Sequence, residues 1–182
     1  DAELERLLEA GVISAGLFRP RPQDEVLGRL ERVRSRGGDT TLGEKMLLAL
    51  LAFSDARAGA PAVASVALAR RALAGGTLHA AETGGGAFAR ACMVLAMADL
   101  DEALTMYDAA LADAHLHGSI SGFAATKVFR AQAFLFRGDL AEAEADSREA
   151  LDACRAWGLQ LLDAFRFVSA EALMEQGKLA EA

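Results

Sequence analysis

Several residue types are scarce in this chain of 182 residues, and each scarcity excludes a class of protein. The only cysteines, Cys92 and Cys154, lie among Ala, Met and Leu, which predicts reduced, buried thiols and no disulfide framework. Only three prolines interrupt the chain, so long helices are possible. The longest apolar run, residues 46–53, is far shorter than the roughly 20 residues that span a bilayer. With no signal peptide pattern either, we expect a cytoplasmic protein without a membrane span.

Basic residues are too few and too scattered to predict a nucleic-acid surface. The chain has 19 Lys and Arg against 26 Asp and Glu, which gives a net charge of −7. The densest basic group, residues 29–36, alternates with glutamates and is typical of a solvated helix face. Phosphate binding needs a clustered basic surface, so we expect no nucleic-acid partner for these residues.

Catalytic and metal-binding motifs are also absent. The glycine run at 83–86 is not followed by Gly-Lys-Ser/Thr, so it predicts a connection rather than a phosphate loop. His115 and His117 are two residues apart, which on a helix directs them to different faces. We expect no catalytic residue, no metal site and no cofactor, and therefore a protein that is not an enzyme.

One motif recurs along the second half of the chain. Residues 137–143 (Arg-Gly-Asp-Leu-Ala-Glu-Ala) resemble residues 97–103 and 176–182, with periods of 40 and 39 residues. In each copy a small residue is followed by Leu two places later and by Ala five places later. Small residues let helices approach closely, so each copy predicts an antiparallel helix pair that is buried against neighbouring copies. Ala103 and Ala143 should then be almost fully buried at helix crossings.

These copies resemble the tetratricopeptide repeat. That repeat has a small and an apolar residue in its first helix, a turn glycine, and two small residues in its second helix. The matching residues are Ala91, Val94, Ala103 and Ala110; Ala131, Phe134, Gly138, Ala143 and Ala150; and Ala170, Leu173 and Gly177. The resemblance extends over residues 85–182, but the period exceeds the standard ~34 residues and the closing proline is missing. It implies an all-α fold with antiparallel helix pairs stacked in a right-handed tetratricopeptide-like superhelix.

The long, Ala- and Arg-rich copies are also similar to the superhelical segment of large bacterial LuxR-type transcriptional regulators, in which an ATPase module precedes the array and a helix-turn-helix follows it. This resemblance implies a non-catalytic sensor or interaction segment cut from a longer polypeptide. The alternative is a free-standing tetratricopeptide-type adaptor. In either case the expected partner is a protein or peptide, with self-association or a small apolar effector as further alternatives.

Helical periodicity, glycine stops and capping residues predict the element boundaries. The expected helix starts are marked by Asp39-Thr40-Thr41 with Glu44, by Asp99, by Ser119 or Ser121, and by Asp139 with Glu142, and the expected stops include Gly11, Gly138 and Gly158. Helices are predicted near residues 2–10, 23–36, 41–58, 61–74, 86–97, 100–117, 121–137, 140–157 and 160–176, with another from 179. Residues 1–40 do not fit the repeat and are assigned to N-terminal helices or a cap, and residues 41–182 to the repeat array.

The resemblance also implies a candidate binding surface. In tetratricopeptide arrays the first helix of each pair lines the concave side. The corresponding residues here are Phe88, Cys92, Leu95, Val128, Gln132, Leu135, Phe167, Glu171 and Met174. This mainly apolar groove could receive an amphipathic helix or an apolar ligand. The binding hypothesis requires Phe88, Leu95, Leu135, Phe167 and Met174 to be partly exposed, whereas the alternative places such residues in the core.

Overall fold

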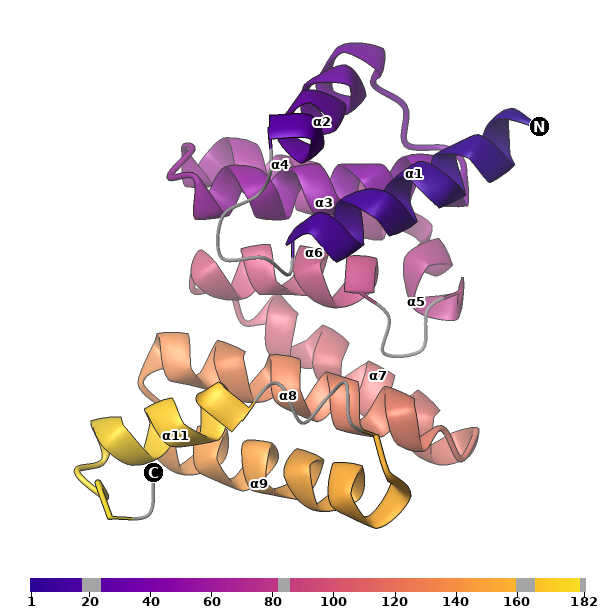
Figure 1. Cartoon of the computed structure of the whole chain (residues 1–182). Helices are drawn as coiled ribbons and strands as arrows, with labels where there is room; N and C mark the ends of the chain where they lie inside the picture. Colours follow the sequence, from indigo (N-terminus) through magenta and orange to yellow (C-terminus); the bar gives the residue numbers. More distant parts are fainter. Residues whose placement is uncertain (18–23, 82–85, 160–165, 181–182) are drawn as a thin grey trace. The chain divides into compact units, whose positions relative to one another are not determined.

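All secondary structure in the part of the chain described by the computed structural model, residues 1–17, 24–81, 86–159 and 166–180, is helical (Figure 1). The α-helices are α1 (Ala2–Leu17), α2 (Asp24–Arg36), α3 (Leu42–Arg57), α4 (Ala62–Leu73), α5 (Thr77–Ala81), α6 (Gly86–Met97), α7 (Glu102–Leu116), α8 (Ile120–Arg137), α9 (Leu140–Trp157) and α11 (Arg166–Glu175). A short 3-10 helix, Ala74–Gly76, joins α4 to α5. The all-α prediction is confirmed for these residues. None of their helices is long and apolar enough to span a membrane.

The chain divides into two compact units. Unit 1 contains α1 to α6, and unit 2 begins at Asp99 and contains α7 to α11. The predicted boundary at residue 40 falls inside unit 1, where α1 and α2 both pack against α3.

The core of unit 1 is built from helices with apolar residues at helical spacing. In α2, Val26, Leu30 and Val33 recur every three or four residues and form one buried stripe. They pack with one face of α1 and with α3 in a single cluster. On the other side of α3 lie α4 and α6, which also contact each other. Since α6 is in contact with both, every residue from Ala87 to Ala96 is buried.

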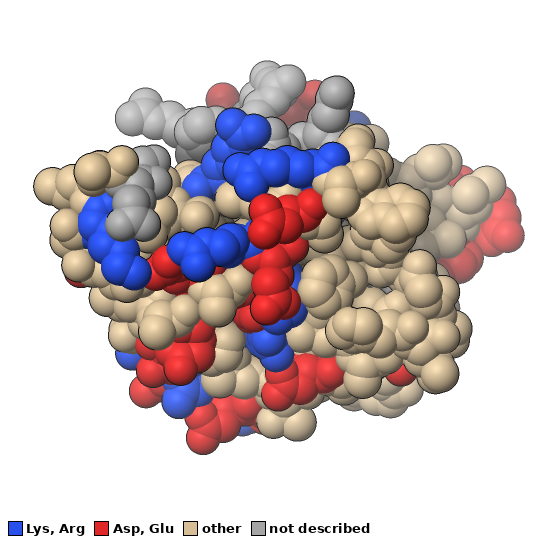
Figure 2. All heavy atoms as spheres, turned by 90° about the horizontal axis from the view of Figure 1, so that it is seen from below, with Lys and Arg blue, Asp and Glu red and all other residues tan. Residues whose placement is uncertain are grey.

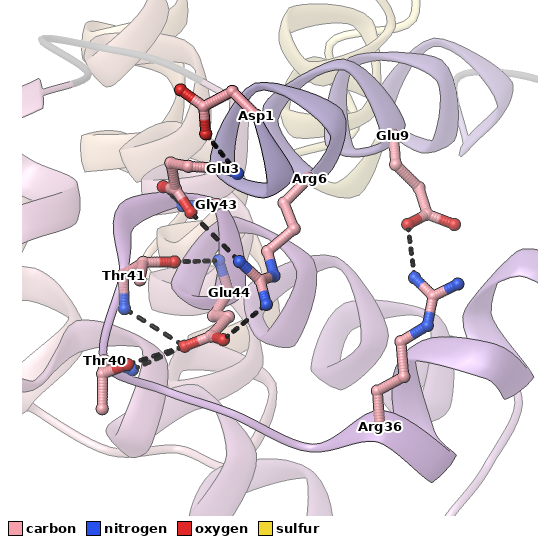
Figure 3. Close-up of polar contacts among 9 residues, drawn as sticks. All are labelled: Asp1, Glu3, Arg6, Glu9, Arg36, Thr40, Thr41, Gly43 and Glu44. Atoms are coloured by element: carbon pink, nitrogen blue, oxygen red, sulfur yellow. Dashed lines mark hydrogen bonds and ion pairs between the residues drawn. The ribbon is translucent and has the colours of Figure 1, made fainter.

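The first turns of α1 and α3 are held together by polar contacts (Figure 3). Glu3 Oε1 accepts a hydrogen bond of 2.7 Å from the backbone N–H of Gly43, and the Arg6 guanidinium lies 3.3 Å from the Glu44 carboxylate. Glycine is required at position 43, because a Cβ there would lie 2.6 Å from the Cβ of Arg6. These contacts fix the position of α1 on α3.

The start of α3 is a capping box, as the sequence predicts. The Thr41 hydroxyl accepts a hydrogen bond from the Glu44 N–H, and the Glu44 carboxylate accepts one from the Thr41 N–H. Glu44 Oε2 also accepts hydrogen bonds from the hydroxyl and the N–H of Thr40 (Figure 3). The Thr40 hydroxyl, followed by the backbone N–H groups of Thr41 and Thr40, lowers the pKa of Glu44 below its ordinary value.

Unit 2 is organised around a helical hairpin. Only Gly138 and Asp139 separate α8 from α9, so these two helices run antiparallel and pack along their length (Figure 1). The turn is closed by Gly138, whose φ of 80° is the left-handed conformation expected of a C-terminal cap. On one side α7 contacts α8, and α11 contacts both α8 and α9.

Small residues occupy the predicted crossings. Ala103, Ala110, Ala143 and Ala150 are all buried. The prediction that Ala103 and Ala143 are almost fully buried is therefore confirmed.

Three predicted boundaries are wrong. Gly11 does not end α1, which continues to Leu17 because Ile13 and Leu17 enter the core beyond it. Asp99 does not mark the start of α7, which begins at Glu102 with Asp101 at the cap position. The start of α9 is as predicted, but Asp139 makes no side-chain capping hydrogen bond; its carboxylate instead lies 3.5 Å from Arg137 Nε. Leu179 lies in a turn rather than at the start of a helix.

Candidate functional site

The nine residues of the predicted concave surface differ widely in exposure. Those that are buried are Phe88, Cys92, Leu95 and Val128; those that are half-buried are Gln132 and Leu135; those that are exposed are Phe167, Glu171 and Met174. The first three lie in unit 1 and the other six in unit 2.

The expectation that Phe88 and Leu95 are partly exposed is wrong. Phe88 is only 2% exposed, and its ring stacks on that of His79 with centroids 5.0 Å apart. Phe88 and Leu95 belong to α6, which is apolar on nearly all sides and packs against α3, α4 and α5. Cys92 is buried in the same helix. In α6 the tetratricopeptide-like positions therefore contribute to the core of unit 1.

Val128 is buried for a different reason. It forms a small core cluster with Ala131 of α8, Ala150 of α9 and Val168 of α11, and Leu135 packs against this cluster. The cluster anchors one side of α11 to the α8–α9 hairpin. Of the sequence-predicted residues in unit 2, Val128 and Leu135 thus support the helix on which the exposed residues lie.

Three of the exposed residues of α11 form one face of that helix, whose end residues Arg166 and Glu175 are also exposed. Phe167, Glu171 and Met174 are spaced by four and three residues, and Phe167 and Met174 are 50% and 57% exposed. We call these three residues the α11 face. Val168, Ala172 and Leu173 lie on the opposite side and are buried. The α11 face is consequently an apolar surface with one carboxylate between two large apolar side chains.

Polar contacts fix the C-terminal end of α11 to the start of α9. The Gln176 side-chain amide donates to the backbone carbonyl of Leu140 at 3.1 Å and to Glu144 Oε2 at 2.9 Å. Lys178 Nζ donates to the same carboxylate oxygen at 2.7 Å. The Lys178 ammonium, followed by the Gln176 amide, lowers the pKa of Glu144. The α11 face is therefore carried by a helix that is held at both its core side and its end.

A buried ion-pair network joins α8 to α9, and the sequence analysis missed it. Asp146 accepts from Lys127 Nζ at 2.5 Å and from Arg130 Nε at 2.6 Å, and Arg130 also pairs with Asp108 of α7. Burial lowers the pKa of Arg130, but hydrogen bonds from its guanidinium to Asp146 and Asp108 outweigh this effect. The pKa of Arg130 is therefore above its ordinary value. Both Asp146 oxygens are engaged, so this carboxylate fixes the hairpin and is a poor candidate for a catalytic base.

A signal for this network was present in the sequence. Lys127 lies three residues after Ala124 and four before Ala131, on the buried side of α8. A charge at such a position needs a partner, and Asp146 is the carboxylate that α9 supplies.

The residues considered for chemistry have other contacts. His115 Nδ1 and His117 Nδ1 each lie within 2.9 Å of the backbone carbonyl four residues earlier in α7. Within the described residues, no three His, Cys, Asp or Glu side chains are grouped as metal ligands. Three members of the glycine run, 83–85, lie outside the described residues, and Gly86 begins α6.

Charges of both signs are mixed on the face shown in Figure 2, where Lys and Arg lie beside Asp and Glu. Comparisons of the chain with protein-family models, with curated proteins and with solved structures gave no match.

Proposed function

We propose that this chain is a non-catalytic helical repeat module whose α11 face binds an amphipathic helix of a protein partner. The observation that carries the proposal is the exposure of Phe167 and Met174 on a helix whose other side is anchored in the core. Aligned apolar side chains on a rigid surface commonly mark an interaction site. The α11 face lies on a helix rather than a loop, so its side chains are presented with a defined spacing.

The chemistry of the α11 face specifies the partner. Two large apolar residues seven positions apart match the apolar stripe of an amphipathic helix, which repeats every three or four residues. Glu171 lies between them and favours a partner with Lys or Arg at the edge of that stripe. The expected ligand is thus a basic amphipathic helix.

The wider context of the module is also a proposal. Recurring buried alanines support helix pairs stacked in a right-handed tetratricopeptide-like superhelix, and the Ala- and Arg-rich repeats are similar to the array of LuxR-type transcriptional regulators. We assign the module to the sensor or interaction segment of such a regulator. The full-length gene product tests this assignment: a Walker A motif upstream and a helix-turn-helix downstream support it, and the absence of both supports a free-standing adaptor.

Binding at the α11 face is tested by selecting helical peptides from a displayed library against the wild-type chain. Enriched peptides should carry apolar residues at helical spacing with basic residues beside them, and should bind the Phe167→Ser/Met174→Ser variant at least about tenfold more weakly. Leu116→Ser is the matched control, because Leu116 is 79% exposed on α7. If no peptide is enriched, or if the double variant binds as tightly as the wild type, the proposed site is wrong.

A further inference from the structure

The first helix of the chain is apolar on two opposite sides. Ala10, Ile13 and Leu17 of α1 pack in the core of unit 1. On the other side, a row of exposed residues is spaced by four, three and four positions. These residues, which we call the α1 seam, are Leu4, Leu8, Gly11 and Ala15. Leu8 is 64% exposed, and Val12 beside the seam is exposed as well. A surface helix usually has one apolar side, so the second side points to an interaction.

Gly11 has no role inside the unit that would explain it. A glycine in a helix interior costs about 1 kcal/mol relative to alanine. Apart from the chain neighbours and the backbone of α1 itself, no atom of the described residues lies within 4 Å of the position that a Cβ at residue 11 would occupy, so no described neighbouring element requires glycine there. A small residue on an exposed seam does permit another helix to approach closely.

The α1 seam is complementary to itself when two copies run antiparallel. Its spacing is that of a coiled-coil contact, with large residues in the first half and small residues in the second. A two-fold axis between Glu9 and Ala10 places Leu4 against the partner's Ala15 and Leu8 against the partner's Gly11. Each large side chain then faces a small one, whereas a parallel pair would place Leu8 against the partner's Leu8 and leave the small residues facing each other.

Charge favours the same orientation. Asp1 and Glu5 are exposed at the N-terminal end of α1, whereas Glu9, the only charged residue from 8 to 15, is half-buried and pairs with Arg36 at 3.0 Å. A parallel pair would therefore bring like charges together. A groove of about 530 Å³ runs between α1 and α2, lined by Glu5, Glu9 and Val12 on one side and by Arg29 and Arg36 on the other, with Arg36 paired to Glu9. In the antiparallel pair the partner's Glu5 lies beside Val12, in the groove that Arg29 and Arg36 line.

Arg29 can pair with a second carboxylate on the groove side. Its side chain is 28% exposed, and its Nη2 pairs with Glu25, whose own side chain is 69% exposed. A guanidinium has five N–H donors and can bind two carboxylates, so a carboxylate in the groove would add a charge-assisted hydrogen bond.

We propose that two copies of this chain associate through their α1 seams as an antiparallel two-fold pair, in which the partner's Glu5 pairs with Arg29. The contact uses one helix of 16 residues, about 24 Å long, and is therefore at the small end of specific interfaces. The dimer is accordingly weak and concentration-dependent. It uses unit 1, so it neither requires nor excludes partner binding at the α11 face.

Sedimentation equilibrium of the full chain at concentrations up to about 0.5 mM tests the proposal. The wild type should form a reversible dimer, and Leu8→Lys should weaken dimerisation at least about tenfold. Leu116→Lys is the control, because it replaces another highly exposed leucine and should leave dimerisation unchanged. A wild-type chain that stays monomeric throughout would overturn the proposal and leave the α1 seam to a different partner, as would equal effects of the two lysine variants.

Two further variants separate association from folding. Gly11→Leu should raise the thermal stability of the dilute monomer, because leucine favours helix, while it weakens the dimer by filling the close contact. Glu5→Arg and Arg29→Glu should each weaken the dimer, and the double variant should recover most of the lost affinity. Unchanged dimerisation in Gly11→Leu, or no recovery in the double variant, would contradict the antiparallel arrangement.

Discussion

At the scale of single residues, two phenylalanines have opposite surroundings. Phe88 is buried in α6 against His79, and half of the surface of Phe167 faces solvent. Phe88→Ala should lower the free energy of unfolding by about 3 to 5 kcal/mol, because it leaves a cavity in the core. Phe167→Ala should lower it by about 1 kcal/mol or less. Urea unfolding followed by helical circular dichroism measures both, and equal losses would show that Phe167 belongs to the core.

Among the charged residues of unit 2, Asp146 should contribute most to the free energy of unfolding. Asp146→Ala leaves the buried Lys127 and the half-buried Arg130 without their shared carboxylate and should cost about 3 to 5 kcal/mol of unfolding free energy. Asp152→Ala on the same helix is the control; it removes only an exposed pair with Arg155 and should cost less than about 1 kcal/mol. A similar, small loss from both variants would mean that the buried network contributes little.

At the scale of helices, the repeat register is tested at the crossings. Ala143→Leu should overpack the α9 crossing and cost about 1 to 3 kcal/mol. Ala145→Leu, an identical change at an exposed position two residues further along α9, should be nearly neutral. The difference between their denaturation midpoints measures the constraint at position 143, and its absence would show that the register is wrong.

The start of α3 gives a pH-dependent prediction. Because the folded pKa of Glu44 is lowered, its contribution to stability is complete above the ordinary value of 4.5 and is lost as the pH falls through the folded value. Glu44→Gln should therefore lose less stability than the wild type as the pH falls from 7 to about 3. Glu142→Gln, at an exposed position of α9, is the control. If the stability of the wild type and of Glu44→Gln depended on pH in the same way, Glu44 would not be stabilising the cap as a carboxylate.

Local signals in the sequence predicted most of the helices. The cap with Glu44, formed by Thr41, and the left-handed Gly138 and Gly158 stops are confirmed, because each depends on neighbouring backbone groups. Of the two serines predicted to cap α8, Ser119 and Ser121, the structure uses Ser119. Gly11 was misinterpreted because core contacts made by Ile13 outweigh the local preference of a glycine to end a helix. The short helix α5 was also missed, since five residues carry too little periodicity to be recognised.

The candidate site was less predictable than the helices. Phe88 and Phe167 hold equivalent places in the repeat, but only the surroundings of α6 decide that Phe88 is buried. Apolar residues at helical spacing fit a groove and a core equally well. The exposure of a side chain depends on which other helices cover it. This is decided by the tertiary packing and not by the local sequence pattern.

At the scale of the whole molecule, the chain has two compact units, each with its own proposed contact. The proposed contact at the α1 seam of unit 1 explains why a glycine and two leucines are exposed on α1 and do not pack in the core of the unit. The α11 face of unit 2 accounts for exposed apolar residues on a well-anchored helix. Because the two surfaces share no residues, substitutions in one should leave the other's binding unchanged.

Amide hydrogen exchange of the full chain, with and without a peptide selected as described above, shows whether the partner binds at the α11 face. The peptide should slow exchange in α11 and in the second half of α8, which supports α11 through Val128 and Leu135. Exchange in α1 and α2 should be unaffected. Protection confined to α1, to α2 or to the exposed side of α9, with α11 unchanged, would contradict the assignment of partner binding to the α11 face.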